Sequence, residues 1–212
     1  MATERMDPTR VETVHWVSGF MTHGSDESAQ LQFLQELFPL SKVAHCEWGN
    51  FDSDNRLKRI TRKTYSYASK EADRAHLELI DKIENDERPL RSILIGHSLG
   101  GRIVVNALSE MGTHGALRAG YAVLLGAAVE ARNEEFWQTV VNGCRNTIYN
   151  VCDYEDEILG ALFSVRHQAK AVGQVGTRSE NGHIVDLQLC PEGRISALKN
   201  ATSGRRKRIL AD

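Results

Sequence analysis

The chain has 212 residues, of which 41% are hydrophobic and 25% are charged, and its formal net charge is −2. A chain of this length suits one domain with a full core, and a net charge near zero argues against general nucleic-acid binding. Its apolar runs are all shorter than the roughly 18 residues that span a membrane. The polar segment 1–10 lacks the apolar core of a secretory signal. We therefore expect one cytoplasmic domain over residues 1–212, with flexible tails at 1–10 and 203–212.

The cysteines and several histidines are scattered along the chain and lack the grouping that is typical of metal ligands. The residues concerned are Cys46, Cys144, Cys152, Cys190, His15, His45 and His76. A cytoplasmic chain of this length does not need disulfides, so we expect the cysteines to be reduced and mostly buried. The sequence therefore predicts no metal and no cofactor. The tryptophans are expected in the core or at the rim of a pocket.

Strands and helices are expected to alternate along the whole chain. Strands are predicted at 11–19, 42–48, 91–95, 119–129 and 147–152, with weaker ones at 172–176 and 184–189. Helices are predicted at 25–38, 65–87, 99–108, 133–142, 155–164 and 194–200, and 51–64 is expected as a loop or surface helix. This alternation predicts an α/β fold with a mostly parallel sheet and helices on both faces. In such a fold the functional site lies beyond the carboxyl ends of the strands.

The segment 96–100, Gly-His-Ser-Leu-Gly, lies between a short buried strand and a helix. This is the G-x-S-x-G pattern of a nucleophile elbow, and it has the strand-before, helix-after context that the motif requires. A serine at so sharp a turn is strained, and glycines two residues to either side have no Cβ to clash. Ser98 would project at the amino end of a helix, whose dipole favours developing negative charge. We therefore predict that Ser98 is a catalytic nucleophile.

A serine nucleophile needs a base, and the base needs an orienting carboxylate. In chain order the carboxylate and then the histidine are expected after Ser98. Asp153 comes directly after the strand at 147–152, whereas Asp156 comes three residues later. His167 and His183 are the histidines that follow these acids, and His183 is favoured because His167 follows a helix.

The segment around Ser98 resembles the lipase and esterase branch of the α/β-hydrolase superfamily. The motifs at 124–129, 149–151 and 156–159 further resemble an uncharacterised hydrolase-like family, some eukaryotic members of which carry transmembrane and coiled-coil segments. The likeness runs from about Val14 to Phe163. It implies an α/β-hydrolase fold.

The resemblance also implies roles for individual residues. It makes Asp156 the acid in preference to Asp153. The segment 17–20 is similar to the first-strand oxyanion segment, which implies that the backbone N–H groups of Phe20 and Leu99 form the oxyanion hole. The family pattern has a histidine after a Val-Asp segment. In this chain no histidine follows 184–186, and His183 directly precedes it.

The predicted function is that of a serine hydrolase that cleaves carboxylic esters or thioesters through an acyl-enzyme. The partner expected is a small-molecule or acylated substrate, without nucleic acid or a membrane span. The short connection from 129 to 134 leaves no room for an inserted cap, which predicts a minimal, open site. Because no histidine follows 184–186, where the family pattern has one, a non-catalytic binding protein of the same fold is the alternative function. A third possibility is an acyltransferase that passes the acyl group to an acceptor other than water.

Overall fold

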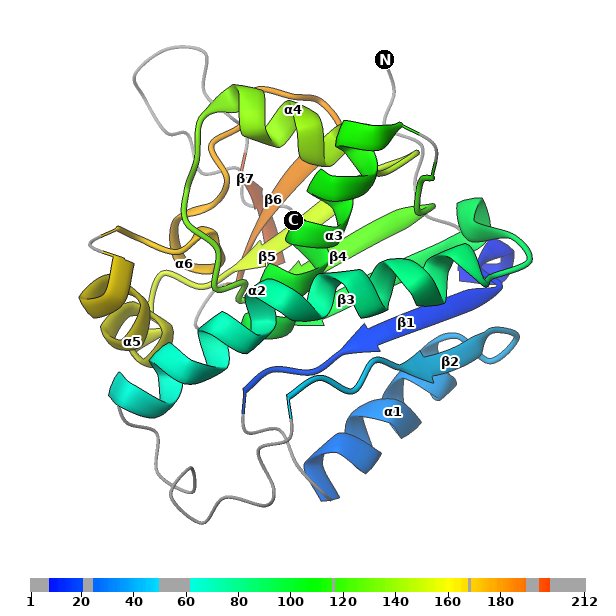
Figure 1. Cartoon of the computed structure of the whole chain (residues 1–212), viewed down its shortest axis with the longest axis horizontal. Helices are drawn as coiled ribbons and strands as arrows, with labels where there is room; N and C mark the ends of the chain where they lie inside the picture. Colours follow the sequence, from blue (N-terminus) through cyan, green and yellow to red (C-terminus); the bar gives the residue numbers. More distant parts are fainter. Residues whose placement is uncertain are drawn as a thin grey trace.

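The computed structural model of this chain describes residues 8–20, 25–49, 62–115, 117–167, 169–189 and 195–198. Its centre is a seven-stranded sheet in the order β2-β1-β3-β4-β5-β6-β7 (Figure 1). The strands are β1 (Thr13–Val17), β2 (Lys42–His45), β3 (Ser92–His97), β4 (Tyr121–Leu125), β5 (Ile148–Cys152), β6 (Ile184–Leu189) and β7 (Ile195–Leu198). Strands β1 to β6 are parallel, and β7 joins the edge antiparallel to β6.

Helices cover both faces of the sheet, so the predicted α/β fold with a mostly parallel sheet is confirmed. The helices are α1 (Ser25–Leu37), α2 (Arg62–Glu84), α3 (Leu99–His114), α4 (Glu134–Asn142), α5 (Glu157–His167) and α6 (Val172–Val175), with 3-10 turns η1 (Pro8–Arg10) and η3 (Pro89–Arg91). The described connection between β4 and α4, residues 126–133, holds no inserted cap, as predicted. No helix within the described residues is long and apolar enough to cross a membrane.

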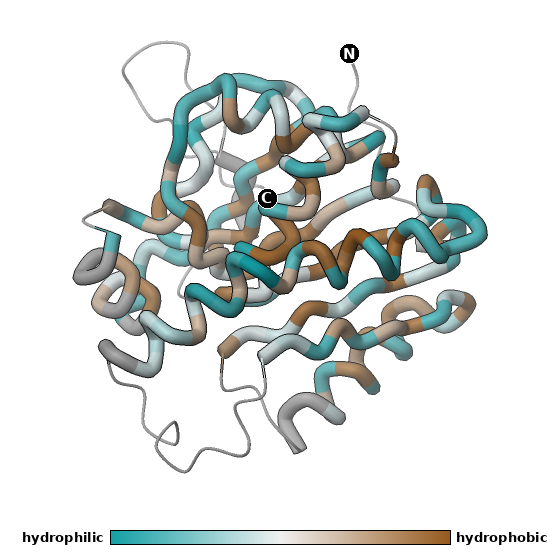
Figure 2. The backbone as a smooth tube through the Cα atoms, in the orientation of Figure 1, coloured by the Kyte–Doolittle hydropathy of each residue, from teal (hydrophilic) through white to brown (hydrophobic). Residues whose placement is uncertain are grey.

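The two faces of the sheet are covered unequally. The larger hydrophobic cluster lies on the face that carries α2, α3 and α4, and it includes the fully buried Leu79, Ile103 and Trp137. The smaller cluster lies on the other face, where Leu34 of α1 and Phe38, which follows α1, pack against the sheet. Figure 2 shows hydrophobic residues gathered along the central strands and α3, while α2 alternates between hydrophobic and hydrophilic residues. Most of the burial that stabilises the fold is therefore on the α3 face.

Two predicted elements are wrong in type. The segment 172–176, predicted as a weak strand, forms the short helix α6, because its backbone groups bond to neighbouring connections: Gly173 N–H donates to Ala127 O, and Gly173 O accepts from Asp153 N–H. The segment 194–200, predicted as a helix, contains β7, because the unpaired backbone groups at the edge of β6 can hydrogen-bond to another strand.

The segment 51–61 and the tails 1–7 and 199–212 lie outside the described residues. Cys46, Cys144 and Cys152 are unpaired and buried, as predicted, and Cys190 lies outside the described residues.

The order of strands reverses direction between β1 and β3. The chain goes outward from β1 to β2 and then returns to the other side of β1 as β3. The connections after β1 and β3 therefore leave on opposite faces, and a crevice forms between them at the carboxyl ends of these strands. Ser98 follows β3 and Ser18 follows β1, so the topology brings both predicted site segments to this point.

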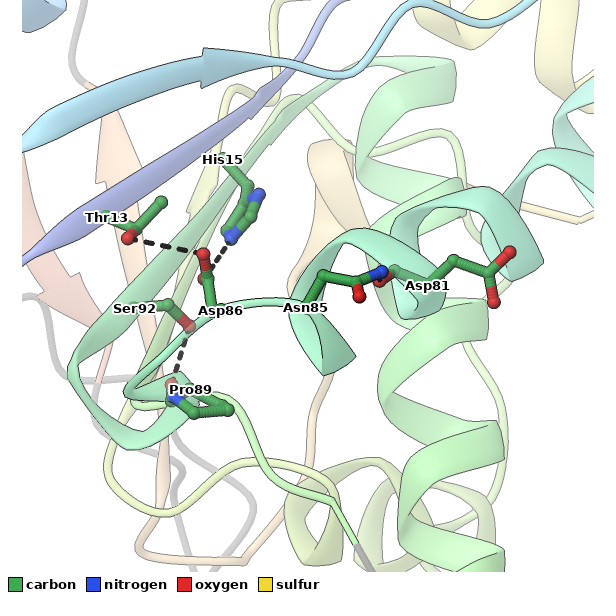
Figure 3. Close-up of polar contacts among 7 residues, drawn as sticks. All are labelled: Thr13, His15, Asp81, Asn85, Asp86, Pro89 and Ser92. Carbon is green, nitrogen blue, oxygen red and sulfur yellow. Dashed lines mark hydrogen bonds and ion pairs between the residues drawn. The ribbon is translucent and has the colours of Figure 1, made fainter.

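At the opposite end of the sheet, a buried histidine ties β1 to the chain that follows α2 (Figure 3). His15 Nε2 lies 2.7 Å from Asp86 Oδ2, and Thr13 Oγ1 donates to Asp86 Oδ1 over 3.4 Å. The His15 side chain is 2% exposed, and its buried Nδ1 has no hydrogen-bond partner among the described residues. Burial lowers the pKa of His15, and the Asp86 carboxylate opposes this shift. The folded protein therefore favours the neutral imidazole.

This placement predicts that the free energy of unfolding falls between about pH 7 and pH 5. In the unfolded chain a histidine has its ordinary pKa of about 6.5, so the unfolded state binds the proton first as the pH falls, and stability decreases. In the variant His15→Asn the free energy of unfolding should change less between pH 7 and pH 5, which urea unfolding at both pH values measures. The exposed His114→Asn on α3 is the matched control and should keep the wild-type slope. Equal slopes for His15→Asn and the wild type would contradict the assignment.

Candidate active site

Ser98 occupies a strained turn between β3 and α3. Its backbone angles are φ 53° and ψ −117°, a region that residues with a Cβ rarely adopt and that costs about 1–3 kcal/mol. Two backbone hydrogen bonds hold it there: Ser98 N–H donates to Leu125 O over 2.9 Å, and Ala128 N–H donates to Ser98 O over 3.0 Å. A serine before a helix commonly caps it through its hydroxyl, but the Ser98 hydroxyl makes no such bond. The strained turn therefore presents a hydroxyl that the helix does not use.

The glycines of the motif permit close backbone contact around this turn. A Cβ on Gly96 would lie 2.6 Å from Gly100 O, and a Cβ on Gly100 would overlap Val17 O and lie 2.5 Å from Ser18 O. The start of α3 thus packs directly on the backbone at the end of β1. This contact requires glycine because no side chain fits between the two backbones.

The end of β1 lies beside the elbow, as the predicted oxyanion segment requires. A Cβ on Gly19 would lie 2.7 Å from His97 Nδ1 and 3.2 Å from Ser98 Cβ, so Gly19 adjoins both side chains. Phe20 follows Gly19 and packs against the larger core cluster. Leu99 is the first residue of α3, so its N–H has no acceptor within the helix.

Asp156 lies at the same edge of the sheet. Its Oδ1 accepts from Leu159 N–H over 2.8 Å and so caps α5, while no described residue donates to its Oδ2. That second oxygen lies 3.8 Å from the position of a Cβ on Gly126, the residue that follows β4. The charge of Asp156 also acts on His97: burial lowers the pKa of His97, and Asp156 partly offsets this effect. The structure thus places the predicted acid near the elbow.

The two alternative residues have other contacts. Asp153 Oδ1 accepts from Glu155 N–H over 2.9 Å in a local turn. His167 is the last residue of α5, where its ring stacks on Phe163 with 4.4 Å between centroids. Its Nε2 lies 3.3 Å from Arg102 Nη1, so it belongs to a polar cluster that joins α5 to α3.

The predicted base is not brought to the nucleophile. His183 precedes β6, and its carbonyl accepts from Ile148 N–H at the first residue of β5. Since β3 to β6 are parallel, His183 lies at their amino ends, whereas Ser98 lies at the carboxyl ends. A five-residue strand at about 3.3 Å per residue separates the two edges by roughly 16 Å. The prediction that His183 is the general base therefore disagrees with the fold.

The structure also forms an apolar pocket that the sequence analysis did not predict. It measures about 380 Å³ and lies between α1 and the carboxyl ends of β1, β3 and β4. Its lining includes Trp16, Gln30, Phe33, Ile95, His97 and Leu125. Trp16 is the lining residue for which the sequence carried a relevant prediction, namely that the tryptophans lie in the core or at the rim of a pocket.

The fold and the site together define an α/β protein with a serine at a strained strand–turn–helix corner. Residues 55–192 match a family model described as a protein of unknown function, DUF726, and because this match covers more than half of the chain, the chain belongs to that family. The match contains Ser98 and Asp156 but begins after β1, so it does not include the segment 17–20. No curated protein matches the chain. Family membership agrees with the resemblance to an uncharacterised family and leaves the activity to be argued from the site.

The close contact between α3 and β1 predicts that Gly100→Ala is strongly destabilising. A Cβ at this position meets backbone atoms of Val17 and Ser18, which cannot rotate away, so the loss should reach or exceed the roughly 1–3 kcal/mol of an overpacked core. Urea unfolding measures this change. Gly182→Ala is the matched control, because nothing lies within 4 Å of its Cβ position and its stability should stay near that of the wild type. A Gly100→Ala protein as stable as the wild type would contradict the contact.

Proposed function

We propose that this protein is a serine hydrolase that cleaves carboxylic esters or thioesters through an acyl-enzyme on Ser98. The observation that carries the proposal is the backbone of Ser98, which is held at φ 53° although the hydroxyl contributes no cap to the helix. Strain of this kind persists where the surrounding structure maintains it, and it clusters at active sites. The position of Ser98 at the reversal of strand order supports the same conclusion.

The proposed chemistry follows from the groups around the turn. Ser98 Oγ attacks the carbonyl carbon, its proton passes to a base, and the carbonyl oxygen takes the negative charge. The Leu99 N–H at the start of the 16-residue α3, together with the Phe20 N–H, would donate to that oxygen. The alcohol or thiol then leaves with a proton, and water repeats the attack to release the acid and restore Ser98.

The base in this scheme has to come from the carboxyl edge of the sheet. Among the described histidines, His97 lies beside Ser98, and the lowered pKa keeps its imidazole neutral near pH 7, which is the form that accepts a proton. His23 follows β1 in the sequence and lies outside the described residues. We therefore assign the base to a histidine of this edge, where His97 adjoins Ser98, rather than to His183.

A second candidate function is binding without catalysis. One observation favours it: His183, the residue predicted as the base, lies at the amino ends of the strands and not beside Ser98. A chain of this fold that kept the turn and lost the base could hold a ligand at the same crevice. The two candidates differ in the reactivity of Ser98, which can be measured directly.

The hydrolase proposal predicts that a fluorophosphonate probe labels Ser98. An activated serine attacks the phosphorus of the probe, so the wild type should be labelled, and Ser98→Ala should lose the label, read by gel fluorescence and peptide mass spectrometry. The control Ser109→Ala makes the same change inside α3, and this variant should be labelled like the wild type. Labelling of Ser98→Ala at the wild-type rate would contradict the assignment of the nucleophile, and an unlabelled wild type would favour binding without catalysis.

Ser98→Gly provides a second control for folding. Glycine adopts a φ of 53° without strain, so this variant should also lose the label while its free energy of unfolding exceeds that of Ser98→Ala by about 1 kcal/mol. Loss of label would then reflect the missing hydroxyl and not a disturbed turn.

The acid is tested with two amide variants. Asparagine caps a helix about as well as aspartate, so Asp156→Asn keeps the bond to Leu159 N–H and removes only the charge. We expect it to lower kcat on p-nitrophenyl acetate by at least about 100-fold, in line with triad aspartates changed to amides. Asp153→Asn keeps its own turn bond in the same way and should stay within about threefold. The reverse result would make Asp153 the acid.

A further inference from the structure

The apolar pocket between α1 and the sheet lies at the same edge as Ser98. Trp16, Ile95 and Leu125 reach it from the carboxyl halves of β1, β3 and β4. On the other side, α1 contributes Ala29 and Phe33. The pocket volume of about 380 Å³ falls within the range of small-molecule sites. This is also the face of the sheet with the smaller hydrophobic cluster.

Among the described residues of the lining, none carries a permanent charge. Its polar groups are those of Gln30 and His97 and the indole N–H of Trp16, and burial lowers the pKa of His97, so its ring is neutral near pH 7. A charged ligand group would lose its hydration in this pocket without gaining a counter-charge. The lining therefore favours a neutral hydrocarbon or aromatic group. Phe33 is 61% exposed, which places an apolar side chain at the solvent side of the pocket.

Two residues connect the pocket to the nucleophile. Leu125 lines the pocket, and its carbonyl accepts the hydrogen bond from Ser98 N–H over 2.9 Å. His97 lines the pocket and directly precedes Ser98. Gly19 adjoins both His97 Nδ1 and Ser98 Cβ. The pocket is therefore lined by residues that adjoin Ser98 directly.

We propose that this pocket binds the uncharged, apolar acyl group of the ester or thioester that Ser98 cleaves, an assignment that rests on the proposed function. The acyl group is favoured over the alcohol because it stays bonded to Ser98 Oγ through both halves of the reaction, whereas the alcohol departs after the first half. An acyl chain thus needs a lasting site beside the serine. The substrate class is esters of neutral aliphatic or aromatic acids.

The first test is a series of p-nitrophenyl esters with acyl chains from acetate to decanoate. In the wild type, kcat/KM should rise by roughly two- to fourfold for each added methylene until the pocket is filled. Ala29→Phe fills the pocket from α1 at an exposed position, so it should abolish this rise. Gln32→Phe introduces the same side chain at an exposed position of α1 outside the lining, and it should keep the wild-type series.

The second test measures the pocket without turnover. Ser98→Ala should bind the neutral dye N-phenyl-1-naphthylamine with energy transfer from tryptophan, Trp16 being the donor in the pocket wall, and adding Ala29→Phe should weaken this binding at least fivefold. Dye binding with no hydrolysis by the wild type would overturn the proposed function and retain an apolar site. Hydrolysis with no dependence on chain length, or an equal response of Ala29→Phe and Gln32→Phe, would overturn the acyl pocket and retain the hydrolase. Faster cleavage of a negatively charged succinyl ester than of the butyrate ester would also overturn it.

Discussion

The contact between the start of α3 and the end of β1 is the constraint on which the site depends. Gly100 packs against the carbonyl groups of Val17 and Ser18, and Gly96 packs against Gly100. Trp48 Nε1 donates to Ser18 O over 2.8 Å, which holds the end of β1 against this contact. Because backbone meets backbone here, the position of the turn is fixed by atoms that cannot rotate away. Ser98 takes its strained angles from that fixed geometry.

A buried polar network around Asp186 fixes the segment between α6 and β6, which runs from the carboxyl edge of the sheet to its amino edge. Asp186 on β6 accepts from Thr177 N–H and from Asn150 Nδ2, and the carboxylate is 3% exposed. A buried carboxylate needs such donors to remain stable. The network anchors the segment after α6, and Gly173 in α6 bonds to the chain after β4. The loops at the carboxyl edge are therefore tied to the sheet at several points, as a preorganised site requires.

The sequence predicts the features that arise from local chemistry. The apolar runs locate the parallel strands, and the glycines around Ser98 predict a turn whose strain the structure confirms. Position after β5 indicates both Asp153 and Asp156 as acids at this edge, and only the family resemblance selects Asp156. His183 was misplaced because the chain between α6 and β6 crosses from one edge of the sheet to the other without a periodic pattern, and its path depends on the burial of Asp186 and on the bonds of Gly173. Neither constraint is visible in a linear sequence.

The unequal cover of the sheet decides where a ligand can approach. On the α3 face, the described helices α2, α3 and α4 leave the core closed, with Leu79, Ile103 and Trp137 at 0–1% exposure. On the other face, α1 packs mainly beside β2, while Tyr121, Val123 and Leu125 of β4 are only partly buried. The hydroxyl of Ser98 lies at the edge where these two faces meet. The proposed substrate, with one apolar group and one reacting carbonyl, would match this arrangement, because the α1 face offers an apolar surface and the dipole at the start of α3 favours developing negative charge.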